Sequence, residues 1–167
     1  TIKNIINSNF IGNYVKGNED SAGGAIYSYS DMLITADNGT SLFSGNKAND
    51  KSNAIYMLGW EDMAIDLNLS AVNKGTITFD DGIDGKNYNI NVTGDGSGVV
   101  IFNNLVENVT NFSLSDNSVV HLGLNADIQT QNMSVAAGSQ IVGKNAVSSP
   151  IITVDVEVDK ADNTVNS

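Results

Sequence analysis

The sequence predicts an all-β protein whose chain winds as a parallel β-helix, a solenoid with coils of about 20–23 residues and some inserted loops. Three observations support this fold class. The composition disfavours helices, the apolar residues fall in runs of strand length, and one apolar position recurs at a nearly constant spacing.

The composition is the first observation. The 167 residues include 24 Asn, 17 Ser and 16 Gly, but one Pro and no Cys. Asn and Ser compete with helical hydrogen bonds and Gly loosens the helical backbone, so long helices are disfavoured. These residues are spread evenly, without the change of composition that would mark a second domain. We therefore expect residues 1–160 to form one β-helix segment, part of a longer protein, followed by a tail at 161–167.

Short apolar runs are the second observation, and several of them alternate between apolar and polar residues. Turns rich in Asn, Asp and Gly follow them, a pattern typical of many short strands joined by turns. In chain order the runs are Ala25–Tyr27, Met32–Ile34, Ala54–Met57, Ile65–Leu69, Thr76–Phe79, Tyr88–Val92 and Val99–Phe102.

The third observation is a Gly-x-x-x-Phe unit that continues in relaxed form near the end of the chain. Its apolar ends are separated by 23, 20 and 20 residues, and they are Phe79, Phe102, Leu122 and Val142. We expect these four side chains to point inward at equivalent places on successive coils, because parallel strands stack in register. The steps from Phe10 to Phe43 and on to Phe79 are longer, 33 and 36 residues, which predicts inserted loops there. Asn residues at the turns can form side-chain ladders and adopt left-handed backbone conformations.

The charge excludes several classes of function. There are 19 Asp and Glu residues against 8 Lys and no Arg, for a net charge of −11. An acidic chain without Arg is a poor ligand for nucleic acid, because the phosphate backbone needs cations.

No apolar run reaches the ~18–20 residues of a membrane span, so we expect no membrane insertion by this segment. The absence of Cys excludes a disulfide scaffold and thiol catalysis.

Two short motifs point to a family. Phe-x-x-Asn units stand at Phe10–Asn13 and Phe43–Asn46, and a Gly-Gly-Ala-Ile unit stands at Gly23–Ile26. Together they resemble the paired repeats of polymorphic outer-membrane proteins, a family of bacterial autotransporter adhesins. The Asn- and Gly-rich stretch from Gly75 to Asn145 is similar to the passengers of other large autotransporters. One departure is that Ser52–Ile55 replaces the second Gly-Gly-Ala-Ile unit.

The resemblance implies a right-handed parallel β-helix that is exported and displayed extracellularly on the bacterial cell surface. Its attachment to the outer membrane would run through a part outside these residues. Such passengers serve adhesion or act as stalks, so the expected partner is a cell-surface protein or a glycan receptor. Terminal coils expose unpaired strand edges, and we expect a monomer or end-to-end self-association.

One group of acidic residues is a candidate calcium site. Asp80, Asp81, Asp84 and Asp95, with Asn87, crowd two turns that the sequence places next to each other. Oxygen-rich loops can hold Ca²⁺, although this spacing matches neither an EF-hand nor a nonapeptide calcium repeat. The alternative interpretation is a set of solvated turn residues.

Two further residues are singled out by type. Trp60, the only Trp, falls in the long step between Phe43 and Phe79, on an expected inserted loop beside two acids. It is a candidate contact residue for a partner, and the alternative is that it packs on the outer face of the solenoid. His121 lies out of phase with the inward positions and is expected to be exposed.

The sequence predicts no enzyme activity. The chain has no Arg, and its one His lies between Val120 and Leu122, so the signatures of β-helix lyases and galacturonan hydrolases are absent. The alternatives left open are a carbohydrate-active β-helix that binds or cleaves polysaccharide, and a secreted all-β sandwich that serves as a binding module.

Overall fold

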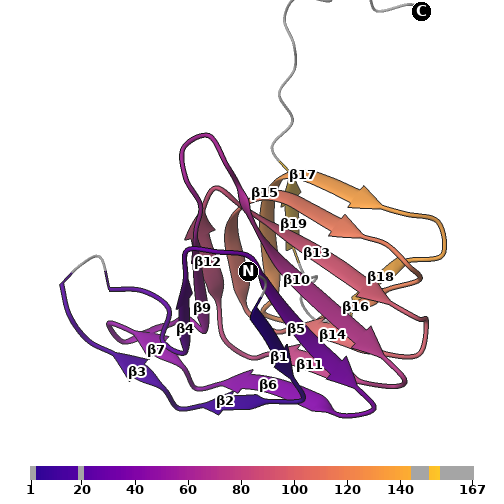
Figure 1. Cartoon of the computed structure of the whole chain (residues 1–167), viewed down its shortest axis with the longest axis horizontal. Helices are drawn as coiled ribbons and strands as arrows, with labels where there is room; N and C mark the ends of the chain where they lie inside the picture. The colour runs from indigo at the N-terminus through magenta and orange to yellow at the C-terminus, as the bar shows by residue number, and fades with distance from the viewer. Residues whose placement is uncertain (1–2, 19–20, 144–150, 155–167) are drawn as a thin grey trace, which may run out of the picture.

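The structure, a computed structural model, describes residues 3–18, 21–143 and 151–154, and its strands lie in curled sheets (Figure 1). These residues form nineteen strands and no helix, which confirms the predicted all-β class. In the described ranges nothing forms a helix of the length and apolarity needed to cross a membrane. Strand pairing there is parallel, except between β7 (Lys47–Ala48) and β8 (Lys51–Ser52) and at an isolated bridge in a loop.

The largest sheet has ten strands in two flanks. The long flank is formed by β1 (Lys3–Ile6), β5 (Met32–Asp37), β10 (Ile65–Val72), β13 (Tyr88–Gly94) and the second parts of β15 (Leu105–Leu114) and β17 (Asp127–Val135). The short flank is formed by β4 (Ile26–Ser28), β9 (Ile55–Leu58), β12 (Ile83–Lys86), the first parts of β15 and β17, and β19 (Ile151–Val154).

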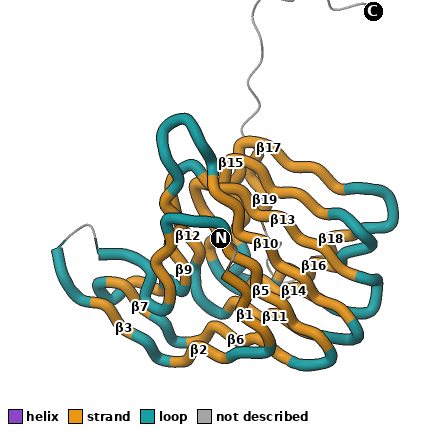
Figure 2. The backbone as a smooth tube through the Cα atoms, viewed as in Figure 1, coloured by secondary structure: helices purple, strands orange, loops and turns teal. Residues whose placement is uncertain are grey.

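A second sheet has six parallel strands and lies between the two flanks along the chain. Its strands are β2 (Asn9–Ile11), β6 (Thr40–Ser44), β11 (Thr76–Phe79), β14 (Val99–Phe102), β16 (Val119–Leu122) and β18 (Gln140–Gly143). Two-residue strand β3 (Tyr14–Val15) pairs with β7 at one corner. The chain passes repeatedly from long flank to second sheet to short flank, and loops join the strands at each corner (Figure 2).

The core between the sheets confirms most of the predicted register. Phe43, Phe79 and Phe102 are fully buried, and each pairs with the next across β6, β11 and β14. Their rings stack with centroids 4.8 and 5.5 Å apart. Phe10 extends the stack at 4.9 Å from Phe43, and Leu122 follows Phe102 in register.

Val142 does not belong to this column, so that part of the prediction is wrong. Leu122 pairs with Gly143, whereas Val142 pairs with His121 and is 38% exposed. The step from Leu122 to its partner is one residue longer than the step before it. A slip of one residue turns every side chain of a strand to the opposite face, so Ile141 points inward instead. His121 lies on the outward side and is half-buried.

Outward-facing side chains form the ladders that Asn favours. On the long flank, Asn89 donates to Asp66 at 2.8 Å, Asn111 to Asn89 at 2.7 Å and Asn132 to Asn111 at 3.2 Å. The sequence predicted such ladders at turns, and the structure forms this one along the strands. Turns carry the left-handed residues as expected, and most non-glycine residues with positive φ are Asn.

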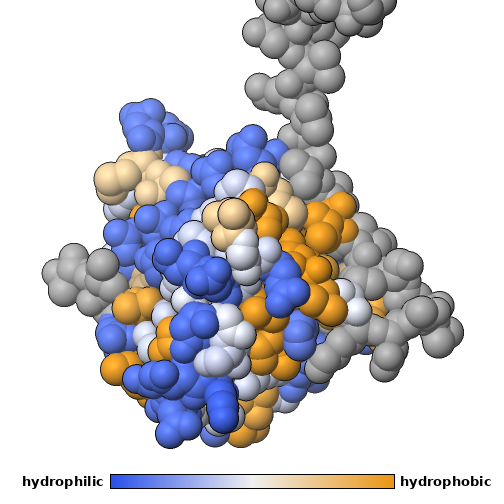
Figure 3. All heavy atoms as spheres, turned by 90° about the vertical axis from the view of Figure 1, so that its right-hand side faces the viewer, coloured by the Kyte–Doolittle hydropathy of each residue, from blue (hydrophilic) through white to orange (hydrophobic). Residues whose placement is uncertain are grey.

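The first and last layers of the described chain expose apolar side chains. Ile6 and Ile11 are 53% and 63% exposed in the first layer, and Val135 is 47% exposed near the end. On the face shown in Figure 3, hydrophobic residues gather in a band beside hydrophilic ones. The tail expected at residues 161–167 lies outside the described residues.

Candidate binding surface

The two flanks of the ten-stranded sheet meet at a bend that recurs from strand to strand. The connecting residues are 29–31 between β4 and β5, 59–64 between β9 and β10, and Asn87 alone between β12 and β13. In β15 the bend falls at a bulge between Val106 and Val109. Asn87 and Asn108 turn it with positive φ angles of 51° and 60°. Because the strands of both flanks pair in parallel, these connections form a column along the molecule, which we call the bend column.

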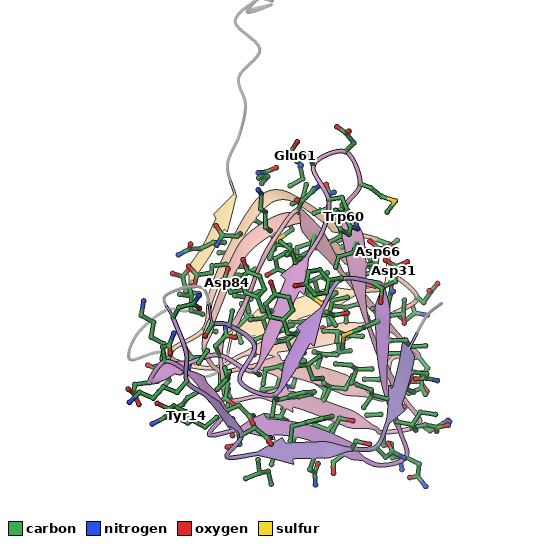
Figure 4. The ribbon with its side chains drawn as sticks, turned by 60° about the vertical axis from the view of Figure 1, so that its left-hand side comes forward. Tyr14, Asp31, Trp60, Glu61, Asp66 and Asp84 are labelled. Carbon is green, nitrogen blue, oxygen red and sulfur yellow. The ribbon has the colours of Figure 1, made fainter. Side chains whose placement is uncertain are left out.

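The longest connection in the bend column is the loop 59–64, which carries Trp60. Trp60 and Met63 exchange backbone hydrogen bonds of 3.0 and 3.1 Å, which places Glu61 and Asp62 at the tip. The side-chain amide of Asn87 also donates to the carbonyl of Trp60. Figure 4 shows Trp60 and Glu61 at this loop, above Asp31 and Asp66. The loop is therefore closed by its own backbone and held to the next connection of the bend column by Asn87.

The loop presents its large side chains to solvent. Trp60 is 61% exposed and Met63 is 59% exposed. The sequence predicted an inserted loop with Trp60 on it, and this placement is confirmed. Because most of the Trp60 side chain is exposed, it is not packed on the outer face, which was the alternative.

An open pocket of about 320 Å³ lies beside this loop in the bend column. Its lining is polar, and it is formed by Gly85, Lys86, Asn87, Asn108, Thr110 and Gln131. Asn87 belongs both to the pocket and to the support of the Trp60 loop. Asn108 is fixed from behind, because its amide donates to Asp84 at 2.7 Å.

Three tyrosines lie on the outward side of the first two short-flank strands. Tyr27 pairs with Tyr56 in register, and their ring centroids are 5.1 Å apart. Tyr29, in the first connection of the bend column, packs on Tyr27 at 5.0 Å. Tyr27 and Tyr29 are 40% and 57% exposed. Exposed aromatic side chains therefore extend from the Trp60 loop to the neighbouring connection after β4.

Carboxylates surround the first part of β15, next to the pocket. Burial, and then the nearby charge of Asp84, raise the pKa of the Glu107 carboxyl above its ordinary value, against the opposing effect of Lys51. Burial also raises the pKa of the Tyr88 phenol, whose hydroxyl donates to the Glu107 carbonyl at 2.7 Å. The surroundings of the pocket are therefore negative, with Lys86 as the one cationic residue in its lining.

The four acidic residues of the candidate calcium site are not brought together. Asp80 and Asp81 follow β11, whereas Asp95 follows β13, a strand of seven residues that spans about 20 Å. Among the described residues, no group of three or more His, Cys, Asp or Glu side chains could hold a metal ion. Their spacing in the sequence suggested adjacent turns, but the turns lie at different corners of the fold.

Asp80, Asp81 and Asp95 instead accept hydrogen bonds from turn residues, and Asp84, which lies within β12, accepts from Asn108. Asp81, only 5% exposed, accepts from the backbone amides of Gly45 and Asn46 at 3.0 and 2.9 Å and from the Asn46 side chain at 2.7 Å. Asp95 accepts from the backbone amides of Asn73, Ser97 and Gly98, and these bonds hold its pKa well below the ordinary value. Asp80 accepts from Asn103 at 2.8 Å.

Comparison with models of protein families, with curated proteins and with solved structures finds no match.

Several residues of this surface were missed by sequence reasoning. Asn108 and Gln131 follow Asn87, which the sequence associated only with the candidate calcium site. The successive steps from Asn87 are close to the predicted repeat length, and this is the signal that could have found them. Tyr29 carried no such signal, since it follows a short strand in a stretch with little periodicity.

Proposed function

We propose that this chain is a non-catalytic segment of a bacterial autotransporter-like passenger, displayed extracellularly on the cell surface, where it binds a receptor on host or neighbouring cells. The repeated path through three strand faces supports a parallel β-helix as its architecture, and the family resemblance supplies the right-handed sense. Parallel pairing across both large sheets favours this architecture over a sandwich, which is built from antiparallel strands.

The observation that carries the proposal is the bend column. A stiff stack of strands holds Trp60, Tyr29 and a polar pocket on one side of the molecule, exposed to solvent. Aromatic side chains that are exposed yet fixed by their surroundings are enriched where proteins bind partners. Loops positioned by a rigid scaffold are also the usual place of binding residues.

A test of adhesion compares labelled wild-type chain with Trp60→Ala on bacterial and epithelial cells. We expect saturable binding that the variant weakens strongly, because Trp60 is the largest exposed side chain of the surface. Tyr14→Ala is the matched control, since Tyr14 is 48% exposed but lies at the far corner on β3 (Figure 4). Equal loss in both variants, or no saturable binding of the wild type, would contradict the proposal.

A carbohydrate-active β-helix is the second candidate, and the Glu107 carboxyl favours it. Its raised pKa beside Asp84 is a feature that acid–base catalysis uses. Incubation with neutral and acidic polysaccharides, followed by an assay for reducing or unsaturated ends, separates the two candidates. If the wild type releases such ends and Glu107→Gln does not, the chain is catalytic rather than adhesive.

A further inference from the structure

The pocket of the bend column has a lining of one chemical kind. Three of its side chains end in amides, Asn87, Asn108 and Gln131, and Thr110 adds a hydroxyl. Amides and hydroxyls both donate and accept hydrogen bonds, so together they match a ligand that carries many hydroxyl groups in fixed positions. Asn87 and Asn108 already donate to Trp60 and Asp84 and keep their amide oxygens as acceptors. A lipid or an apolar peptide would leave the Gln131 amide and the Thr110 hydroxyl without partners, which costs free energy.

Aromatic side chains lie on one side of the pocket, in the preceding connections of the same column. Trp60 comes from the loop that Asn87 supports, and Tyr29 comes from the preceding connection. The apolar face of a pyranose ring packs on an aromatic ring, while its hydroxyl groups project sideways to polar neighbours. A polar pocket beside exposed aromatic rings therefore has both parts that recognition of a sugar requires.

On this basis we propose that the bend column binds an uncharged saccharide, with Trp60 and Tyr29 stacking on sugar rings and the pocket amides bonding to hydroxyl groups. The inference rests on the proposed adhesive function and names the receptor chemistry. It assigns as contact residues the aromatic residues Trp60 and Tyr29 and the pocket residues Asn87, Asn108, Thr110 and Gln131.

The charge of the molecule selects an uncharged saccharide over an acidic one. The chain carries a net charge of −11, and Glu107 and Asp84 lie next to the pocket. Lys86 is the one cation in the lining, and the described chain holds no Arg to bind a carboxylate or sulfate with two parallel bonds. Uronic acids and sialic acids would be repelled, most strongly at low salt.

The size of the pocket fits a small ligand better than a protein. A volume of about 320 Å³ lies at the lower end of the range of ligand sites, roughly 300–1,000 Å³. A stable protein partner buries about 800 Å² on each side and relies on a central apolar cluster. The bend column instead offers separate aromatic side chains on one side of a polar pocket. Because the pocket is open, we expect weak binding of single oligosaccharides and stronger binding of clustered ones.

The test uses an array of immobilised neutral and acidic oligosaccharides, followed by calorimetry with the best neutral compound. We expect neutral oligosaccharides to bind and acidic ones to bind less, with the difference shrinking at high salt. Trp60→Ala and Gln131→Ala should each weaken binding by about tenfold or more. The matched controls are Tyr14→Ala and Gln140→Ala, since Gln140 is an exposed glutamine of β18 in the other sheet.

Several outcomes overturn this inference, and they differ from those that overturn the proposed function. Preference for acidic saccharides, or equal loss in test and control variants, contradicts the assignment of the ligand. If cells bind the chain equally well after periodate has destroyed their surface sugars, the receptor is a protein, and the adhesive function stands without this inference. If neither cells nor saccharides bind the chain, both fail.

Discussion

Replacing Phe102 by Ala is the sharpest test of how the chain stacks. Phe102 is fully buried, and its ring lies 5.5 Å from that of Phe79 and 5.8 Å from that of Phe112. Truncating a buried Phe costs about 3–5 kcal/mol, because apolar contacts are lost and a cavity remains. We expect the upper part of this range, since each aromatic pair contributes about 0.5–1.5 kcal/mol beyond its burial.

The assay is urea unfolding followed by circular dichroism, with thermal melting as a second measure. For a chain of this length, a loss of 3–5 kcal/mol lowers the melting temperature by about 6–20 °C. The slope of the free energy against urea should stay the same, because the surface exposed on unfolding hardly changes.

Val142→Ala is the control that distinguishes the two registers. The sequence put Val142 in the same inward column as Phe102, whereas the structure pairs it with His121 on the outward side. We expect a change below about 0.5 kcal/mol for this partly exposed residue. A loss for Val142→Ala comparable to that for Phe102→Ala, or a loss below about 1 kcal/mol for Phe102→Ala, would refute the reasoning.

The Phe column shows what sequence periodicity can predict. Burial selects large apolar side chains at one inward position, and parallel pairing repeats that position in every layer, so the spacing of Phe79 and Phe102 carries the register. The slip before Val142 was not predictable in the same way. Both Ile141 and Val142 are apolar, and the length of the intervening turns decides which of them points inward.

The acidic turns show why neighbours in sequence are poor guides to a site. Asp81 and Asp95 are near each other in the chain, yet whole strands carry them to different corners. Asp81 meets Asn46, which is far away in sequence, because each layer places its turn above the preceding one. As an acidic residue in a turn, Asp81 was predicted to be a metal ligand or a solvated side chain. In the structure it is buried and accepts hydrogen bonds from the turn of the preceding layer.

The bend column contains both kinds of feature, periodic positions and contacts between residues far apart in the sequence. Asn87 and Asn108 repeat at about the coil length because a left-handed residue is needed wherever the sheet bends without a loop. This periodic part was present in the sequence. The contact between Asn87 and the Trp60 loop could not be read from the sequence. It exists because the bend after β9 carries an inserted loop, whereas the neighbouring bend after β12 is made by Asn87 alone.

Three further changes test the polar parts of the structure. Asp81→Ala should cost about 1–3 kcal/mol in urea unfolding, because it leaves the buried amide of Asn46 and the amide of Gly45 without their acceptor, and Asp80→Ala at the exposed neighbouring position should cost less. Asn89→Ala interrupts the ladder between Asp66 and Asn111, and we expect a loss of about 1 kcal/mol in the same assay, whereas no loss would mean that the ladder is not stabilising. Glu107→Gln should stabilise the protein at pH 7. Because the pKa of Glu107 is higher in the folded chain than its ordinary value of 4.5, the folded state holds the proton more tightly than the unfolded state does. Ionisation therefore costs stability, in full above the raised pKa and not at all below the ordinary one, so the advantage of Gln should fade as the pH falls toward 4. Urea unfolding of both proteins at pH 7 and pH 4 measures this difference, and an equal advantage at both pH values would show that the carboxylate charge is not its cause.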